Sequence, residues 1–543
     1  MTITDLLKDG MANAINRKRW LHEGNPDLAH DALSRNRVAS GKGAHGAVAS
    51  GSPHATRAGM EILRRGGNAA DAAASAAFAM MVSDPPNASP AGRGHILWAR
   101  KGDIPKAVDG ATKIPSLLPE GVGGFSDRQA LPLPGIVRAV VKFQAEAGRL
   151  PLQDVVESAR RLARDGFVVP LELAQIWAWR APELMDEDAR RHYLPDDKPV
   201  GEGEVFRNPG LAAFFDQLAE TGRDPFSDPD FASGICGRLS EKGAHWSVDD
   251  LIAADPLDGE IVRLDGDDWN LTSVGRQGWG HTLLRIVALV DSAGAYTPLD
   301  SEIAHLLSIL RAFEERPEEL RSLKPKTNPL PWDILASKLD DPLPEDWSEL
   351  GVLAEAVERV RLPASLEDRD TTHLSVIDAD GMRVALTQSI GPHFGARVAD
   401  PETGILLAHS YRMAQDPLPG ARDVTEQCPC LLDMPTGQFS LGGAGSERIP
   451  GAVAAVIRHL LDGKSLSRAL AAPRSNWVGA TARLHLDVAS GLEDRLTGAG
   501  VEFEYTGRGP VDHLGIVQAV GQSVDGQVIA AADPAYAGAA SAE

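Results

Sequence analysis

The residues with the clearest chemical potential are Asp370-Thr371-Thr372-His373, at the start of a stretch in which apolar residues alternate. A threonine hydroxyl is a weak nucleophile unless a nearby base takes its proton. A free α-amine on the same threonine can be that base, because its pKa of about 8 lies close to physiological pH. Thr371 has such an amine only if the Asp370–Thr371 bond is cut, and its own hydroxyl can cut that bond through an N-to-O acyl shift. A self-cleaving precursor with a threonine nucleophile is therefore one interpretation of this segment.

A glycine-rich segment, LGGAGSERI at 441–449, offers a partner for this chemistry. It lies just before an expected helix, and consecutive backbone N–H groups in such a segment can stabilise an oxyanion. Two simpler interpretations remain open. The loop could cradle a phosphate, although it lacks the G-x-G-x-x-G spacing and a Walker lysine. The Thr-Thr pair also fits ordinary β-propensity at a strand start.

The elements around these residues combine strands and helices. Segment 371–390 predicts a β-hairpin that turns at 378–381. Asn68 is expected to cap an alanine-rich, buried helix that ends at Asp84-Pro85-Pro86. Further strands are expected at 95–100, 106–111, 437–443, 483–488 and 515–520, and further helices at 281–291 and 449–461. Strands accompanied by helices throughout the chain predict an α/β layered protein.

Composition and charge limit the function classes. The chain has 543 residues, of which 43% are hydrophobic and 5% aromatic, so it is globular with an aliphatic core. This length corresponds to several domains of typical size or to one large layered core. The formal net charge of −22 argues against a nucleic-acid partner, which would need a concentrated basic surface.

The cysteines and the first residues of the chain bear on its cofactors and its cellular location. Cys236, Cys428 and Cys430 are too few for a disulfide framework, and Cys428-Pro-Cys430 lacks the spacing of a zinc or redox motif. We therefore expect no metal and no cofactor. No basic start leads into an apolar block, and no apolar run reaches the length of a membrane span. The expectation is a cytoplasmic protein without a membrane partner.

The motifs together resemble the γ-glutamyltransferase family of N-terminal-nucleophile (Ntn) hydrolases, with this chain as a divergent member. The resemblance is carried by TTHLSVIDADGMRVALTQSIGPHFG from 371, SPHATRAGMEILRRGGNAADAA from 52, LGGAGSERI from 441 and LAAPR from 470. It implies a four-layer αββα sandwich. It also implies that Thr371 is the nucleophile, that Ser389 orients it, and that Gly445 and Ser446 form the oxyanion site.

The glutamate-recognising positions of that family are altered. The arginine that binds the substrate carboxylate falls on Ala111, and the asparagine after the orienting hydroxyl falls on Gly391. The acidic pair falls on Arg412-Met413, and the serine pair on Thr425-Glu426. Losing an arginine–carboxylate clamp costs a few kcal/mol, so altered specificity is expected. The substrate-binding candidates are Arg93, Lys113, His393, Arg412, Thr425 and Glu426.

The sequence thus predicts an N-terminal arm (1–44), a large subunit (45–370) and a small subunit (371–543), intertwined in one fold after self-cleavage. The expected enzyme attacks an amide or acyl bond of a small metabolite through an acyl-Thr371 intermediate. Whether the subunit pair dimerises is left open. The alternatives are an oxamate-type or carbon–carbon-bond hydrolase, a true γ-glutamyl hydrolase or transferase, and an unprocessed relative without enzymatic activity.

Overall fold

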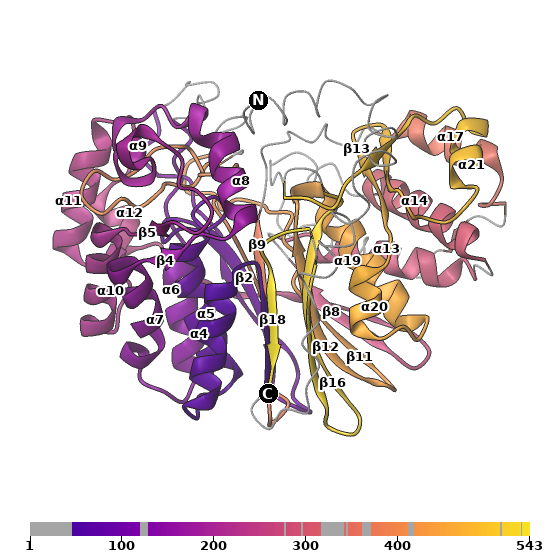
Figure 1. Ribbon diagram of the computed structural model, residues 1–543, viewed down its shortest axis with the longest axis horizontal. Helices are drawn as coiled ribbons and strands as arrows, with labels where there is room; N and C mark the ends of the chain where they lie inside the picture. Colours follow the sequence, from indigo (N-terminus) through magenta and orange to yellow (C-terminus); the bar gives the residue numbers. More distant parts are fainter. Residues whose placement is uncertain are drawn as a thin grey trace.

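The computed structural model describes residues 46–119, 129–275, 278–294, 297–315, 342–343, 346–360, 371–410, 418–510, 513–533 and 535–543. The predicted N-terminal arm and the Asp370 side of the cleavage point lie outside these residues. Two mainly antiparallel sheets lie face to face at the centre of the molecule, with a layer of helices outside each of them (Figure 1). The predicted αββα sandwich is confirmed.

The first sheet has seven strands in the order β18-β1-β9-β10-β2-β3-β6. Its centre is the predicted hairpin, in which β9 and β10 pair from Thr372↔Gln388 to Ile377↔Arg383. The C-terminal strand pairs with the first strand of the described chain, so the first and last described strands lie side by side at this edge of the sheet. The strands are β1 (Gly46–Ser50), β2 (Arg93–Ala99), β3 (Lys106–Gly110), β6 (Leu257–Gly259), β9 (Thr372–Asp378), β10 (Arg383–Ser389) and β18 (Ala539–Ala542).

The second sheet has six strands in the order β17-β16-β12-β11-β8-β7. Strands β12 and β16 lie against β9 of the first sheet, and this contact brings the glycine-rich segment close to the start of the hairpin. The strands are β7 (Ile261–Asp265), β8 (Asn270–Val274), β11 (Cys430–Met434), β12 (Gly437–Ala444), β16 (Ile516–Ser523) and β17 (Val528–Ala532).

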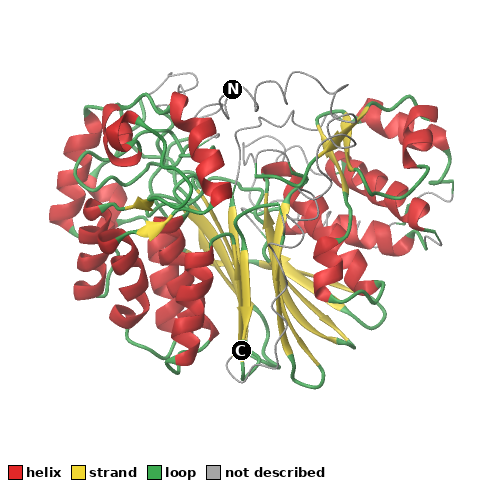
Figure 2. Cartoon of the chain, viewed as in Figure 1, coloured by secondary structure: helices red, strands yellow, loops and turns green. Residues whose placement is uncertain are grey.

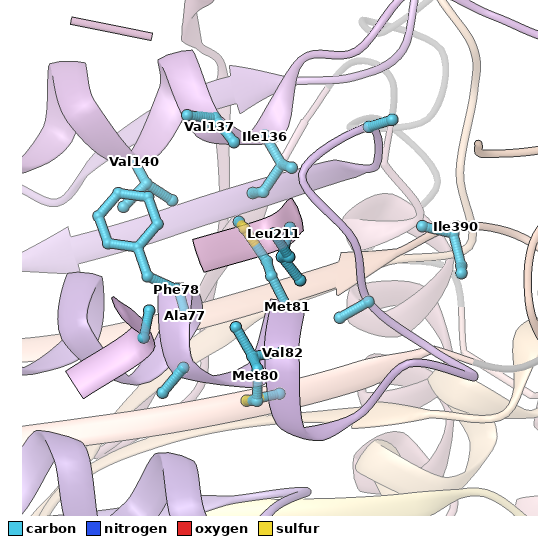
Figure 3. Packing of buried hydrophobic residues seen from close by; sticks show 14 of the residues in the cluster. Ala77, Phe78, Met80, Met81, Val82, Ile136, Val137, Val140, Leu211 and Ile390 are labelled. Carbon is cyan, nitrogen blue, oxygen red and sulfur yellow. The ribbon is translucent and has the colours of Figure 1, made fainter. Parts of the chain in front are cut away.

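The helix layer on the first sheet is built around α5 (Ala69–Ser83), every residue of which is buried. Asn68 begins this helix with a capping box, its side chain accepting from the Ala70 and Asp71 N–H groups, as predicted. The alanine-rich surface lets neighbouring elements approach closely, and Figure 3 shows Phe78 and Met81 packed toward Ile136 and Val140 of α6. The layer also contains α4 (Pro53–Arg64), α6 (Ile136–Ala147), α7 (Leu152–Asp165) and α10 (Pro209–Thr221).

The helix layer on the second sheet is centred on α19, whose bounds match the predicted 449–461 segment. It has its own aliphatic core, separate from the core beneath α5. The elements on this side are α13 (Gly280–Ser292), α14 (Pro298–Glu314), α17 (Leu350–Arg359), α19 (Ile449–Leu461), α20 (Leu466–Ala471), α21 (Leu492–Gly498) and a small sheet of β13 (Ser475–Val478), β14 (Thr481–His485) and β15 (Phe503–Thr506).

The remaining elements form a shorter subdomain beside the first helix layer (Figure 2). They are α8 (Leu171–Arg180), α9 (Glu187–Tyr193), α11 (Pro229–Ser240), α12 (Val248–Ile252), β4 (Phe167–Val168), β5 (Val205–Phe206) and short 3-10 turns at 181–183, 195–197 and 225–227. A further 3-10 turn, at 446–448, lies between β12 and α19 on the second sheet. No helix in the described ranges is long and apolar enough to cross a membrane.

Candidate active site

The proposed nucleophile, Thr371, is the residue immediately before β9. It is buried, with 7% of its surface exposed. Alternate residues of β9 face the second sheet: a Cβ on Gly442 of β12 would lie 2.4 Å from the His373 ring. Because strand side chains alternate with a period of two, Thr371 points to the same inter-sheet side as His373. The hairpin therefore places the Thr371 side chain between the two sheets.

A small pocket surrounds Thr371, and both sheets contribute to it. Its lining residues are Gly51, Asn87, Thr371, Thr372, His373, Ala444, Ile516, Gln518 and Tyr536. Ala444 is the last residue of β12, directly before the Gly445–Ser446 step. The structure thus brings together the two sequence segments that were expected to supply the nucleophile and the oxyanion donors.

The loop after β12 has an unusual backbone. Gly445 has φ +121° and Ser446 has φ +54°, the left-handed region that L-residues rarely adopt. Arg448 fixes this loop, since its backbone N–H and its Nε both donate to the Gly445 carbonyl oxygen, at 3.1 and 2.9 Å. Because C=O and N–H point in opposite directions across a trans peptide, this directs the Ser446 N–H away from Arg448. The Ser446 hydroxyl is buried without a hydrogen-bond partner in the described structure.

Ser389 ends β10 on the side of the hairpin where Thr371 lies. The pairing Thr372↔Gln388 puts Thr371 and Ser389 at the next step of the ladder, on adjacent strands. The Ser389 hydroxyl accepts a hydrogen bond from the Gly391 N–H at 2.9 Å. Gly391 has φ +95°, so the chain turns sharply just beyond the hydroxyl. Ser389 therefore lies on the strand next to Thr371 and on the same face of the sheet.

His373 lies between the sheets next to Thr371. Its Nδ1 is 2.8 Å from the Thr387 hydroxyl and its Nε2 is 2.9 Å from the Ser375 hydroxyl. Complete burial lowers the pKa of His373 to about 3. A neutral imidazole held by two hydroxyl groups links β9 to β10.

A hydrogen-bonded group that the sequence did not reveal forms one wall of the pocket. The Tyr536 hydroxyl donates to Asp84 Oδ1 at 2.8 Å and accepts from Asn87 Nδ2 at 3.1 Å. Asn87 also donates to Asp84 Oδ1 at 3.0 Å, and its Oδ1 is 3.1 Å from His393 Nδ1. His393, a predicted substrate-binding residue, is therefore joined to the pocket wall through Asn87.

The other substrate-binding candidates lie around the ends of β2 and β3. Arg93 begins β2 and is 96% buried. Thr425 is buried, and its hydroxyl lies 3.1 Å from Nε2 of His95, which is also on β2. Lys113 and Glu426 are half-buried, and Lys113 pairs through its backbone with Leu133. Arg412 and Asp370 lie outside the described residues.

Asp423 and Arg93 lie close together near the start of β2, and each has polar partners there. Asp423 accepts from the hydroxyls of Thr112 and Ser410, at 2.5 and 2.6 Å. Arg93 Nη1 is 4.0 Å from Asp423 Oδ2 and donates to the His409 carbonyl oxygen at 3.0 Å. Within the described ranges, no group of three His, Cys, Asp or Glu side chains is arranged to hold a metal ion.

Comparison with known proteins agrees with this arrangement. The family model described as gamma-glutamyltranspeptidase matches residues 55–543, which is most of the chain. The chain belongs to the γ-glutamyltranspeptidase family. Among curated family members, it is 26% identical to the glutathione hydrolase proenzyme of Escherichia coli K12 over 381 residues, covering 67% of this chain but only 65% of that relative. It is 27% identical to the acylase ACY 1 proenzyme of Pseudomonas sp. SE83 over 496 residues, covering 84% of this chain and 87% of that protein.

A solved structure with the same architecture supports the fold. The crystal structure of cephalosporin acylase from Bacillus halodurans superposes with a TM-score of 0.79 at 22% identity, covering 94% of this chain and 97% of that one. At this identity the likeness concerns the αββα architecture alone. Both curated relatives are described as proenzymes, which is the form expected of a chain that is processed into two subunits.

Proposed function

We propose that this member of the γ-glutamyltranspeptidase family cleaves itself before Thr371 and then hydrolyses an amide or acyl bond of a small metabolite. The observation that carries the proposal is the shared pocket, which brings Thr371 together with Ala444, the residue before the Gly445–Ser446 step. A nucleophile and backbone donors that lie close together are two requirements of acyl transfer. The products of processing would be residues 1–370 and 371–543.

The proposed reaction has two stages. The Thr371 hydroxyl attacks the substrate carbonyl carbon while its own α-amine takes the hydroxyl proton. The Gly445 and Ser446 N–H groups stabilise the resulting oxyanion, and the amine passes the proton to the departing nitrogen. Water then attacks the acyl-Thr371 ester, with the same amine as base, and releases the acid. Ser389, one ladder step across from Thr371, would orient the nucleophile.

Specificity for something other than a γ-glutamyl group is part of the proposal. Ala111 and Gly391 have no charged or amide side chain at the positions where glutamate recognition would be expected. An amino acid substrate needs partners for both its carboxylate and its ammonium group, and unpaired buried charges are costly. The altered positions therefore favour an acyl group that lacks the amino acid head.

Chromogenic anilides test both parts of this proposal. The wild-type protein should release p-nitroaniline from simple acyl-p-nitroanilides, and Thr371→Ala should release none. Turnover of γ-glutamyl-p-nitroanilide should be at least about 100-fold poorer in kcat/KM, the loss expected without an arginine clamp. Equal or better turnover of the γ-glutamyl compound would instead support a glutathione hydrolase activity, as the E. coli relative's name describes for that protein.

A further inference from the structure

We propose that Arg93 is the specificity-determining residue of this site and that it binds a carboxylate at the far end of the substrate's acyl group. The inference rests on the proposed function, since it concerns the acyl group that Thr371 would attack. It names the class of substrate as short acyl groups that end in a carboxylate. The geometry of the first sheet carries it.

The strand register places Arg93 at the same level as the nucleophile. Ser389 of β10 pairs with Arg93 of β2, and Thr371 lies one step beyond the Thr372↔Gln388 pair, opposite Ser389. Thr371, Ser389 and Arg93 thus occupy one rung across three adjacent strands. Residues on one rung share a face of the sheet, so all three side chains point between the sheets. Adjacent strands are about 4.8 Å apart, so Arg93 begins about 10 Å from Thr371.

The position beside Arg93 just after the next strand, Ala111, offers no charged side chain. Gly94 pairs with Gly110, which places Ala111 of the following segment beside Arg93. Ala111 is 98% buried and has no polar side-chain atom. Among the described residues at this level of the sheet, Arg93 is thus the one with a positively charged side chain. It lies one strand closer to Thr371 than Ala111 does.

The guanidinium lies beside the turn that follows Ser389. A Cβ placed on Gly391 would lie 3.6 Å from Arg93 Nη2 and 3.1 Å from the His409 carbonyl oxygen. The same carbonyl accepts from Arg93 Nη1 at 3.0 Å, so one hydrogen bond fixes the direction of the side chain. Because residue 391 is glycine, no side chain of this turn packs against Nη2.

The nearest carboxylate balances the charge of Arg93 without occupying its fork. Asp423 Oδ2 is 4.0 Å from Nη1, beyond hydrogen-bond distance, and both Asp423 oxygens already accept from Thr112 and Ser410. Arg93 Nε has no hydrogen-bond partner among the described residues. A planar guanidinium presents its donors in pairs that match the two oxygens of a carboxylate. The proposal places the terminal carboxylate of a short acyl chain on this fork, about two strand spacings from Thr371.

Buried arginines occur elsewhere in the sheet, and one of them provides a matched control. Arg383 begins β10, faces the same inter-sheet side as Ser389, and is 97% buried with an unpartnered Nε. It pairs with Asp433 at 2.8 Å and lies six residues from Ser389, about 20 Å along the strand. Burial and an unpartnered Nε are therefore common to both arginines, and only Arg93 lies on the rung of the nucleophile.

Calorimetric titration of the mature protein with succinate, glutarate and adipate tests the proposal. At least one of these dicarboxylates should bind the wild type. Arg93→Met should weaken that binding by about 10- to 100-fold, the range for a lost charge-assisted pair. Arg93→Lys, which keeps the charge but not the fork, should weaken it less, and Arg383→Met should leave it within about twofold.

Two results would overturn the proposal. The first is that none of the three anions binds the wild type. The second is that the wild type, Arg93→Lys and Arg93→Met all bind the anion equally well. If Arg93→Met does not fold, the comparison of Arg93→Lys with Arg383→Lys decides the question. The mass of each preparation shows separately whether the chain was cut before Thr371. Arg93-dependent binding to an uncut chain would refute the proposed reaction and keep the recognition site.

Discussion

Arg448 Nε donates to the Gly445 carbonyl oxygen at 2.9 Å, and its Nη1 donates to the His513 carbonyl oxygen at 2.8 Å. One buried guanidinium thus ties the loop after β12 to the segment before β16. The direction of the Gly445–Ser446 peptide depends on this connection, and with it the direction of the proposed oxyanion donor.

Replacing Arg448 with Met should lower kcat for p-nitrophenyl butyrate by about 10- to 100-fold and change KM by less than about threefold. The reason is that misdirected donors lose stabilisation of the transition state rather than of the bound substrate. Steady-state kinetics of Arg448→Met and Arg448→Lys provide the measurement, with Lys expected to be intermediate. A normal kcat in Arg448→Met would show that the loop does not depend on this tie.

Ser446→Gly should keep activity within about threefold and should not destabilise the protein. Glycine adopts φ +54° without the strain that serine has there, but it also makes the unfolded chain more flexible. The two effects on the free energy of unfolding are each about 1 kcal/mol and opposite in sign, so they nearly cancel. The variant also removes a buried hydroxyl that has no partner in the described structure. Ser446→Val, with a β-branched side chain in the left-handed region, should instead lose about 2 kcal/mol or more of unfolding free energy. Urea denaturation of both variants tests this pair, and a stable, active Ser446→Val would contradict the backbone geometry.

Tyr536→Phe should lower kcat about tenfold without unfolding the protein. The variant removes the hydroxyl that joins Asp84 and Asn87 on the wall of the Thr371 pocket, and small displacements of a reacting group are costly. Tyr193→Phe is the matched control, because that hydroxyl is also buried but donates to the Gly404 carbonyl oxygen at 2.7 Å, in the subdomain. Equal effects of the two substitutions on kcat would mean that Tyr536 has only a packing role.

Stability should fall between pH 7 and pH 5 partly because of His373. Burial lowers the pKa of His373 to about 3 in the folded protein, against about 6.5 in the unfolded chain. The unfolded state therefore binds the proton more tightly, so the stabilisation is complete above pH 6.5 and is lost as the pH falls toward 3. For one such group the loss is about 2 kcal/mol between pH 7 and pH 5.

Urea denaturation at the two pH values checks this contribution. The comparison uses Thr371→Ala and Thr371→Ala/His373→Asn, which are single chains under the proposed processing. The pH dependence should be smaller by about 2 kcal/mol in the double variant. His305, whose pKa burial also lowers to about 3, is present in both proteins and cancels. An identical pH dependence in the two proteins would show that His373 is not held neutral.

Local features of this structure were predictable from the sequence because local physics determines them. The alternation and turn residues of 371–390 define the β9–β10 hairpin, and Asn68 with Asp71 defines the start of α5. The glycine-rich segment also lies at the end of a strand, before a helix, as predicted. Each of these depends on residues close together in the chain.

The pocket wall was not predictable because its residues are far apart in the sequence. Tyr536 and Asn87 are separated by 449 positions, and they meet because the C-terminal strand pairs with β1. No spacing rule links residues across such a distance. The rung shared by Thr371, Ser389 and Arg93 likewise depends on strand register, which a sequence reveals only once the strand partners are known.

The mass spectrum of the intact, denatured wild-type protein tests the central claim most directly. Two polypeptides are expected in place of the 57.7 kDa chain, the smaller one beginning at Thr371. Brief exposure to p-nitrophenyl butyrate should add one butyryl group to the smaller polypeptide alone. Thr371→Ala should remain a single unmodified chain, and Thr371→Ser should still be cut. An unbroken wild-type chain that acquires no acyl group would contradict the proposal that Thr371 is the nucleophile.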